Sequence, residues 1–393
     1  MNNESIVVCG SGIVGLAAAL SLSRAGFHTS LVGPIEAVPP AAPDTYCPRV
    51  YALSPASRRF LEALGVWQML DSARISAVES MEVFGDAGGQ VGLQAWQGVQ
   101  PALAWIVESS ELERVLQQAV RIGGVVWRDE KLEHAAPGVV VTEAGRSLPA
   151  DLVVGADGAT SRVRQAFAIA HQSRPYGDTG LVAHLNTGRP HQNAAIQWFT
   201  GDSVLALLPM PNTGDGSQVS MVWSLPAADA DRLRAAARDG RVAALEARLA
   251  ATTGGRLGRL ALRGPVFGFP LFVENSGMVA PGAALVGDAA HRVHPLAGQG
   301  LNLGLADVCA LVEALTAREP YRRVGDSRVL QRYRRMRAEP LLSMKLATDG
   351  LYRLFALKGA PAAMARNAGM RIVDHLPMVK RHLIEAASGW PDY

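Results

Sequence analysis

The six residues from Gly10 to Gly15, Gly-Ser-Gly-Ile-Val-Gly, constrain the fold of this 393-residue chain more than any other segment. The apolar run 5–9 before them reads as a buried strand, and residues 16–25 after them have a helical pattern that ends at Gly26. A dinucleotide-binding fold requires strand, glycine-rich turn and helix in this order, because backbone N–H groups must approach a pyrophosphate. We therefore predict a Rossmann-like α/β domain whose dinucleotide site includes Gly10, Gly12, Ile13, Val14 and Gly15. A chance glycine-rich turn is the alternative.

A second glycine-rich loop, 287–300, lies late in the chain between similar neighbours. It follows the apolar run 283–286 and leads into a helical pattern over 301–316. An aspartate at a strand end can accept hydrogen bonds from hydroxyl groups, and a helix N-terminus offers free N–H donors and partial positive charge. The loop therefore predicts a site for a polyhydroxyl, anionic ligand, in which a structural turn is the alternative role for Asp288. The predicted binding residues are Gly287, Asp288, Gly300, Leu301 and Asn302.

A third strand-and-turn lies between these two, at 151–164. The apolar run 151–156 ends in Asp157-Gly158, and Ser161 stands close to a predicted helix start. We expect Asp157 to belong to the ligand site, either through the ligand itself or by ordering its own turn and the loop at Gly10.

Taken together, the three segments resemble the three fingerprints of class A flavoprotein aromatic hydroxylases, the group that includes 4-hydroxybenzoate hydroxylase. The resemblance spans nearly the whole chain. Further stretches are similar to the ubiquinone-biosynthesis hydroxylases within that group. These stretches are Arg49–Ser54, Leu64–Trp67, Trp198-Phe199, Ala206–Pro209, Leu376-Pro377 and 386–389.

The resemblance implies an FAD enzyme and its chemistry. In that family NAD(P)H reduces the flavin, O2 adds at its C4a carbon, and the hydroperoxide transfers OH to an electron-rich ring. By the same resemblance, Arg49 reaches FAD or its phosphates, with a surface arginine as the alternative, and the N–H groups near Leu301 face the flavin N1/C2 edge. The face where the substrate ring lies is expected at Pro295, Gly298, Gln299 and Gly300.

One departure from the dinucleotide pattern stands at the end of the second predicted strand, 29–32. An acid there usually binds the ribose hydroxyls, but this chain has Gly33, and Glu36 comes three residues too late. A lost hydrogen bond costs about 0.5–1.5 kcal/mol net, which a ligand with as many contacts as FAD tolerates. The gap counts against NAD as the ligand of this site.

The order of patterns predicts two interleaved units and a helical end. We assign 1–72, 99–177 and 277–340 to a discontinuous FAD-binding domain, 78–98 and 178–276 to a β-rich substrate domain, and 341–393 to a C-terminal helical region. Apolar side chains of the β-rich part suit a pocket for an isoprenylated phenol, with the core of the sheet as the alternative. They are Trp198, Leu205, Leu207, Met221, Trp223, Phe267 and Phe269.

Composition excludes several other classes. A net charge of +3 does not suggest a nucleic-acid partner, and three scattered cysteines without a CxxC pair suggest free thiols in a reducing cytoplasm. No metal site is predicted, because His291 and His294 have no companion acid or cysteine at ligand spacing, and both are expected to be loop residues with ordinary hydrogen bonds. No signal peptide is visible, and no apolar run reaches the roughly 18–20 residues that span a bilayer.

The C-terminal quarter suggests a peripheral membrane contact. Residues 318–337 contain eight arginines, and 343–355 has an amphipathic pattern. A basic amphipathic region can lie on an anionic membrane, here the inner face, or join a ubiquinone-biosynthesis complex; a solvated helix face is the alternative. Two other functions stay open: a monooxygenase or dehydrogenase for a different aromatic compound, and a flavin-binding scaffold without turnover.

Overall fold

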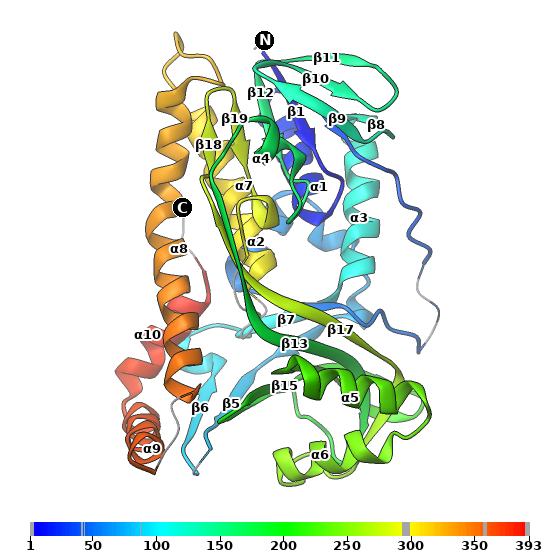
Figure 1. Cartoon of the computed structure of the whole chain (residues 1–393), viewed down its shortest axis with the longest axis vertical. Coiled ribbons are helices and arrows are strands. Elements are labelled where there is room, and N and C mark those ends of the chain that lie inside the picture. Colours follow the sequence, from blue (N-terminus) through cyan, green and yellow to red (C-terminus); the bar gives the residue numbers. More distant parts are fainter. Residues whose placement is uncertain are drawn as a thin grey trace.

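A six-stranded, mainly parallel sheet forms the upper half of the computed structural model, which describes residues 4–40, 42, 44–86, 88–292, 299–356 and 360–389 (Figure 1). In spatial order its strands are β18 (Val279–Ala280), β19 (Ala283–Leu285), β12 (Leu152–Gly155), β1 (Ser5–Cys9), β2 (His28–Val32) and β8 (Val126–Arg128). Only β18 runs antiparallel to its neighbour. The central strands are apolar throughout because both faces of the sheet are covered.

The two faces of this sheet are covered by different layers. Helix α1 (Ile13–Arg24) packs on β1 and β2 and contacts both α3 (Ser109–Ile122) and α7 (Gly300–Thr316). The opposite layer is a small antiparallel sheet, which contacts β1, together with the short helix α4 (Arg162–Ala166). Its strands are β9 (Leu132–Ala136), β10 (Gly138–Thr142) and β11 (Ser147–Ala150).

An eight-stranded sheet forms the lower half. Two strands of 17 residues, β13 (His171–Thr187) and β17 (Leu260–Ser276), run from the upper half into it (Figure 1). The remaining strands are β5 (Ser80–Phe84), β6 (Gln90–Gln94), β14 (Ala194–Thr200), β15 (Ser203–Thr213), β16 (Gly216–Pro226) and β20 (His291–Arg292). Helices α5 (Ala227–Arg238) and α6 (Ala243–Thr253) cover its outer face and enclose a second apolar core.

A three-stranded sheet lies between the two halves and faces the inner side of the large sheet. Its strands are β3 (Val50–Leu53), β7 (Ala104–Glu108) and β4 (Ser76–Val78). Helix α2 (Pro55–Ala63) follows β3, and the 3-10 helices are η1 (Trp67–Met69), η2 (Ser72–Arg74), η3 (Ala95–Gly98) and η4 (Gly287–Ala289).

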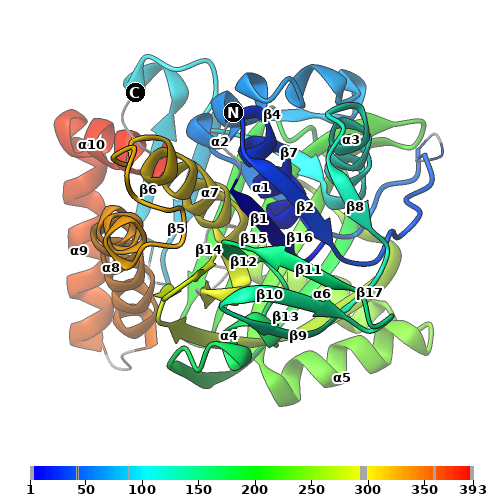
Figure 2. The same cartoon turned by 90° about the horizontal axis from the view of Figure 1, so that it is seen from above.

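The C-terminal helices lie along one side of the molecule (Figure 2). Helix α8 (Ser327–Ala356) packs on α7, and α9 (Ala360–His375) and α10 (Pro377–Ala387) follow it. Helix α9 covers the edge of the large sheet, where the N–H groups of Gly89 and Gly92 donate to the side chains of Asn367 and Asp374. Within the described ranges, no helix has the length and apolarity that crossing a bilayer requires.

The predicted α/β fold class is confirmed, and most predicted elements are present. Helix α2 ends at Ala63, ahead of Gly65 at φ +57°, and α5 and α6 are separated at Gly240. The proposed division of the chain into domains stays a proposal; its boundary at 341 falls inside α8, and that at 177 falls inside β13.

Candidate functional site

The three glycine-rich segments meet at one edge of the parallel sheet. Strands β1, β12 and β19 are neighbours, with Cys9 paired to Gly155 and Gly155 paired to Leu285. Because parallel strands end at the same edge, the loops that begin at Gly10, Ala156 and Val286 open side by side. Segments separated by almost 280 positions in the sequence therefore build one site.

The first loop has the close backbone contacts that its glycines predict. Gly10 has φ +114°, and a Cβ there would overlap the carbonyl oxygen of Ala156. A Cβ on Gly15 would overlap the carbonyl oxygen of Gly10, so the start of α1 packs directly on the turn. A Cβ on Gly12, in contrast, would meet no described atom within 4 Å, which leaves this face of the turn open to a ligand.

The third segment packs against the first through Val14. A Cβ on Gly304 would lie 2.8 Å from this valine side chain, and a Cβ on Gly287 would lie 3.2 Å from it. Ile13 is buried beside it. Small residues on η4 and α7 thus allow the two loops to approach each other across the side chain of Val14.

Two helix N-termini face this site with free donors. Helix α1 begins after Gly12 and α7 after Gln299, and among the described residues neither N-terminus has a side-chain cap. Neither first turn carries an acid. Both ends therefore offer unpaired N–H groups and partial positive charge to an anion.

Asp288 is open to solvent, and its charge acts on Tyr51 of β3. The side chain of Asp288 is 50% exposed, and its carboxylate lies 4.0 Å from the guanidinium of Arg292. Burial raises the pKa of Tyr51 to about 12; the charge of Arg49 opposes this rise and that of Asp288 adds to it. Arg49 is exposed and lies 5.1 Å above the Tyr51 ring, so its guanidinium is accessible to an anionic ligand.

Asp157 caps its own turn, as one of the two expectations for it states. Its Oδ2 accepts hydrogen bonds from the N–H groups of Arg162 and Val163, at 2.7 and 3.1 Å. Its Oδ1 is buried and accepts no hydrogen bond from a described residue. One oxygen therefore orders the turn, and the other is buried without a hydrogen-bond partner among the described residues.

Leu301 and Asn302 are buried at the start of α7, and the side chain of Asn302 is hydrogen-bonded within the protein. Its Oδ1 accepts from the N–H of Ser54 at 2.9 Å, and its Nδ2 donates to the carbonyl oxygen of Ala52 at 2.8 Å. The backbone of Asn302, and not its side chain, is therefore the group left for the predicted contact with FAD. The side chain joins β3 to α7.

A buried ion cluster that the sequence did not reveal supports the third loop. Asp307 accepts hydrogen bonds from the Gly287 N–H (2.9 Å), His291 Nε2 (2.7 Å) and Arg337 Nε (2.6 Å). Burial alone would raise the pKa of Asp307, but the charges of His291 and Arg337 lower it overall. The expectation that His291 is an ordinary loop residue is wrong, since it forms strand β20 and binds an acid 16 positions away.

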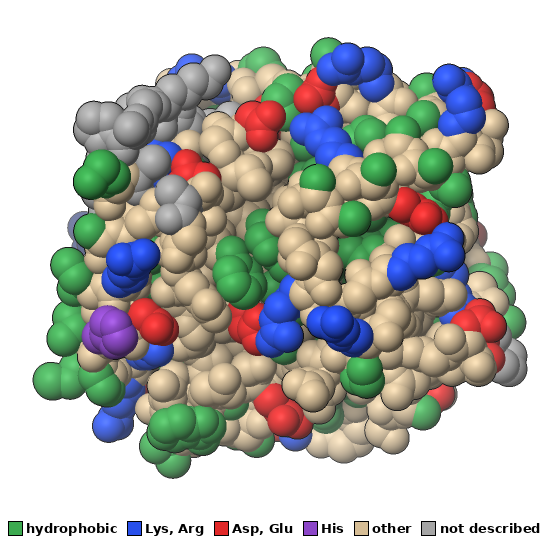
Figure 3. Space-filling view, turned by 90° about the horizontal axis from the view of Figure 1, so that it is seen from below, with side chains coloured by type: hydrophobic (Ala, Val, Ile, Leu, Met, Phe, Trp, Pro, Cys, Tyr) green, Lys and Arg blue, Asp and Glu red, His purple; other side chains and the backbone are tan. Residues whose placement is uncertain are grey.

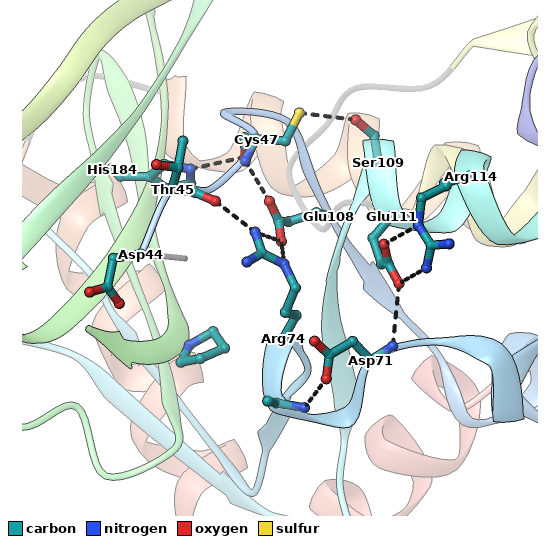
Figure 4. A network of polar contacts seen from close by, with 12 residues as sticks. Asp44, Thr45, Cys47, Asp71, Arg74, Glu108, Ser109, Glu111, Arg114 and His184 are labelled. Atoms are coloured by element: carbon teal, nitrogen blue, oxygen red, sulfur yellow. Dashed lines mark hydrogen bonds and ion pairs between the residues drawn. The ribbon is translucent and has the colours of Figure 1, made fainter. Parts of the chain in front are cut away.

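The segment 44–49 connects the upper half to the large sheet and is fixed by polar contacts (Figure 4). The Cys47 N–H donates to buried Glu108, which also pairs with Arg74, and the Arg74 guanidinium donates to the Thr45 carbonyl oxygen. From the large sheet, His184 Nε2 lies 2.9 Å from the Cys47 carbonyl oxygen. Burial raises the pKa of Glu108 and the neighbouring Arg74 partly offsets that rise.

The missing acid at Gly33 has a steric explanation. A Cβ on Gly33 would lie 2.7 Å from Ser11 Oγ, which donates to the Pro34 carbonyl oxygen at 2.8 Å. A larger residue would displace Ser11 from the first loop. Glu36 is exposed, and its carbonyl oxygen accepts from the side chain of Gln117 on α3.

The apolar residues predicted to form a substrate pocket lie elsewhere. Trp198, Leu205, Leu207, Met221 and Trp223 are buried against α5 and α6, on the outer face of the large sheet, so the pocket prediction is wrong for them and the core alternative holds. Phe267 and Phe269 are exposed on β17. Strict alternation along each strand could not reveal which face the helices would cover.

Gln299 immediately precedes α7 and Gly300 is its first residue, whereas Pro295 and Gly298, the other residues predicted for the substrate face, lie outside the described residues. In the described part of the chain no group of three or more His, Cys, Asp or Glu side chains is arranged to hold a metal ion.

These features fit FAD. Open space at Gly12, two uncapped helix ends, a free oxygen on Asp157 and a half-exposed Asp288 offer donors for a pyrophosphate and acceptors for hydroxyls. The fold and the site thus define a dinucleotide-binding flavoprotein.

Comparison with known proteins identifies the family. The FAD binding domain family matches residues 3–341, and the chain belongs to it. 3-Demethoxyubiquinol 3-hydroxylase of Escherichia coli K12 is 30% identical over 99% of this chain and 100% of its own length. Ubiquinone hydroxylase UbiL of Rhodospirillum rubrum is 32% identical over 98% of this chain and 89% of its own. The chain is an FAD-dependent aromatic hydroxylase of this class A flavoprotein family.

Solved structures agree on the fold. PqsL from Pseudomonas aeruginosa, in complex with 2-aminobenzoylacetate, superposes with a TM-score of 0.73 at 22% identity, covering 94% of this chain and 99% of that one. p-Nitrophenol 4-monooxygenase PnpA from Pseudomonas putida also gives 0.73, at 19% identity over 99% and 100%. At these identities the likeness shows a shared architecture.

Proposed function

We propose that this hydroxylase adds an OH group to the aromatic ring of a polyprenylated phenol in ubiquinone biosynthesis, with NAD(P)H as electron donor and O2 as oxygen source. The single observation that carries the proposal is the full-length similarity to two enzymes named as ubiquinone-type hydroxylases. When bound, FAD supplies the redox chemistry that places one oxygen atom on the ring and releases the other as water.

The chain's own residues hold and shield that cofactor. The N–H groups at the start of α1 bind the pyrophosphate, and Asp288 accepts hydrogen bonds from ribityl hydroxyls. The N-terminus of α7 stabilises negative charge on the flavin ring, because its donors are uncapped among the described residues. Arg49 and the second oxygen of Asp157 are proposed to complete the cofactor site.

The inner face of the large sheet suits an apolar ring. Leu208 and Met210 of β15 form a cluster with Val50 and Ala52 of β3, directly beside the Asn302 contact at the start of α7. An aromatic substrate placed here has apolar walls and lies next to the residues proposed to hold the flavin.

Two experiments test this function. Expression in bacterial strains that are each blocked at one ring-hydroxylation step is expected to restore the quinone of one strain, read by mass spectrometry. With the purified protein, NAD(P)H oxidation should consume O2 and yield a product with one added oxygen atom. NAD(P)H oxidation without an oxygenated product would indicate a dehydrogenase, and no flavin reduction at all would indicate a scaffold.

We also propose that the C-terminal helices contact an anionic membrane, where a polyprenylated substrate resides. The arginine-rich segment is a weaker argument than predicted, because Arg318, Arg322, Arg332 and Arg337 pair with acids of the fold. The stronger argument is a patch of exposed apolar side chains with basic neighbours, visible along the left edge of Figure 3. We use the name C-terminal patch for the exposed apolar and basic residues of α8 to α10, which are Leu346, Met364, Ile372, Leu376, Met378, Leu383, Arg371 and Arg381.

Liposome flotation tests the patch. Vesicles containing anionic lipid are expected to carry the wild type at low salt and less of it at high salt, whereas the variant Ile372→Glu/Met378→Glu should remain unbound. Ile122→Glu is the control, because the exposure of Ile122, 74%, lies between those of Ile372 (60%) and Met378 (86%), but Ile122 is on α3. Wild type that fails to float at either salt concentration would exclude the membrane contact.

A further inference from the structure

The inner face of the large sheet contains a buried polar pair that the contacts described so far do not explain. On β13 and β16 the outward residues, among them Leu185 and Met221, fill the core under α5 and α6. Since side chains alternate along a strand, His184 and Ser220 point to the inner face, toward segment 44–49. Their residue exposures are 6% and 0%.

These two residues are direct neighbours across the sheet. His184 pairs with Ser220, and Ser220 pairs with Leu208, so the three form one row. Directly opposite side chains on antiparallel strands have Cβ atoms about 4.5–5.5 Å apart. Leu208 belongs to the apolar cluster beside β3, which places the polar pair next to the space proposed for the aromatic ring.

Each member of the pair has an unused polar atom. Ser220 Oγ and His184 Nδ1 are both buried, and neither forms a hydrogen bond with a described residue, including each other. His184 Nε2 contacts the Cys47 carbonyl oxygen, which can only accept, so the ring carries its proton on Nε2. Nδ1 is therefore a lone-pair acceptor. Burial favours this neutral form by lowering the pKa of His184, and backbone contacts with Cys47 and Tyr46 only partly oppose it.

Segment 44–49 covers the pair, with the Tyr46 ring edge-on to the His184 ring at a centroid distance of 6.4 Å, and no neighbouring side chain among the described residues satisfies the two unused atoms. Arg263, the cross-strand neighbour of His184 on β17, donates to Thr213 and to the Asp44 carbonyl oxygen instead. The inner-face neighbours Val182 and Val222 are only half-buried although they lie between the two halves of the molecule. A buried acceptor and a buried hydroxyl left without partners are costly, which favours a ligand that satisfies both.

We propose that His184 and Ser220 bind the ring hydroxyl of the phenol substrate. The hydroxyl donates its hydrogen to His184 Nδ1, and its oxygen accepts from the Ser220 hydroxyl. This arrangement requires both a donor and an acceptor on one oxygen atom, which a phenol has and its methyl ether lacks. The inference rests on the proposed function and names the residues that orient the ring and increase its electron density.

Binding to the oxidised, FAD-loaded enzyme without NAD(P)H tests the pair independently of turnover. The probes are 2-prenylphenol and its O-methyl ether, with Kd read from the change in flavin absorbance. Wild type is expected to prefer the phenol by roughly 10- to 100-fold, because the ether has no hydrogen to donate to His184 Nδ1 and its methyl group occupies the position of that hydrogen, which keeps the ether oxygen from Ser220. Ser220→Ala and His184→Phe should each reduce this ratio to below about 3-fold with little change in the Kd of the ether.

The control is Ser224→Ala, since Ser224 is a buried serine on the same strand and the same face, four residues away. It should keep the wild-type ratio. A merely structural role predicts that both probes weaken equally, so an unchanged ratio in either Ser220→Ala or His184→Phe, or no preference in wild type, overturns the proposal. If His184→Phe does not retain FAD, the ratio of the two Kd values in Ser220→Ala alone tests the proposal. Failure of the proposed function would appear instead as the absence of a hydroxylated product.

Discussion

Replacing Asp307 by asparagine is expected to loosen the loop that presents Asp288. Asp307 is fully buried and its two oxygens accept hydrogen bonds from Gly287, His291 and Arg337. Asparagine retains one acceptor oxygen, and its NH2 group would face a donor. Arg337, also fully buried, would lose its counter-charge.

The structure sets the size of this effect. Removing one partner of a buried ion pair costs about 3–5 kcal/mol, because the remaining charge stays desolvated. Typical domains have only about 5–15 kcal/mol of stability in total. Since the Gly287 N–H also loses its acceptor, we expect FAD to bind at least about 10-fold more weakly, which corresponds to about 1.4 kcal/mol.

Urea unfolding of the apoprotein and fluorescence titration with FAD measure the two effects separately. Glu313→Gln is the matched control, because Glu313 lies on the same helix and is exposed. The double variant Asp307→Asn/Arg337→Met should recover a large part of the lost stability, since the buried guanidinium is then removed together with its counter-charge. The reasoning is refuted if Asp307→Asn matches the control, or if the double variant is less stable than the single one.

The dependence of stability on acidic pH is a further test of the cluster of Asp307, His291 and Arg337. His291 and Arg337 hold the pKa of Asp307 below its ordinary value of 3.8 in the folded state. The stabilisation is therefore complete above that value and is lost as pH falls through the lower, folded-state pKa. The stability difference between wild type and Asp307→Asn should be constant above about pH 5 and should shrink in stronger acid.

Three further predictions concern the cofactor site and its supports. Asp288→Ala should leave the purified protein without yellow colour while its apoprotein unfolds like wild type, because this side chain is half-exposed; full retention of FAD would contradict the assignment. Gly12→Ala should weaken FAD binding without lowering apoprotein stability, whereas Gly15→Ala should lower both, since only the second Cβ overlaps protein atoms; equal effects in urea unfolding would contradict this. Burial raises the pKa of Glu108, so its contribution to stability grows as pH falls through that raised pKa toward 4.5; Glu108→Gln should remove this pH dependence from the thermal unfolding midpoint.

Much of the fold and the cofactor site could be predicted because the signals are local. Strand, glycine turn and helix follow one another within about 20 residues at Gly10. The same order recurs around Asp157 and around Asp288. Backbone sterics and the apolar runs determine these units with little help from the rest of the chain. Parallel strands then bring their ends to one edge, so the meeting of the loops could also be inferred.

Only the tertiary structure decided which side chains support the site and which face of the large sheet looks inward. Asp307 and Arg337 are 30 residues apart, and Asn302 reaches Ser54 across 248 positions, so no local pattern connects them. The alternation of side chains along β14 to β16 does not show which face of the sheet is covered. Trp198 and Trp223 are in the core because α5 and α6 pack on their face. The same packing left His184 and Ser220 on the inner face of the large sheet, because burial of the larger apolar face turned every second residue inward.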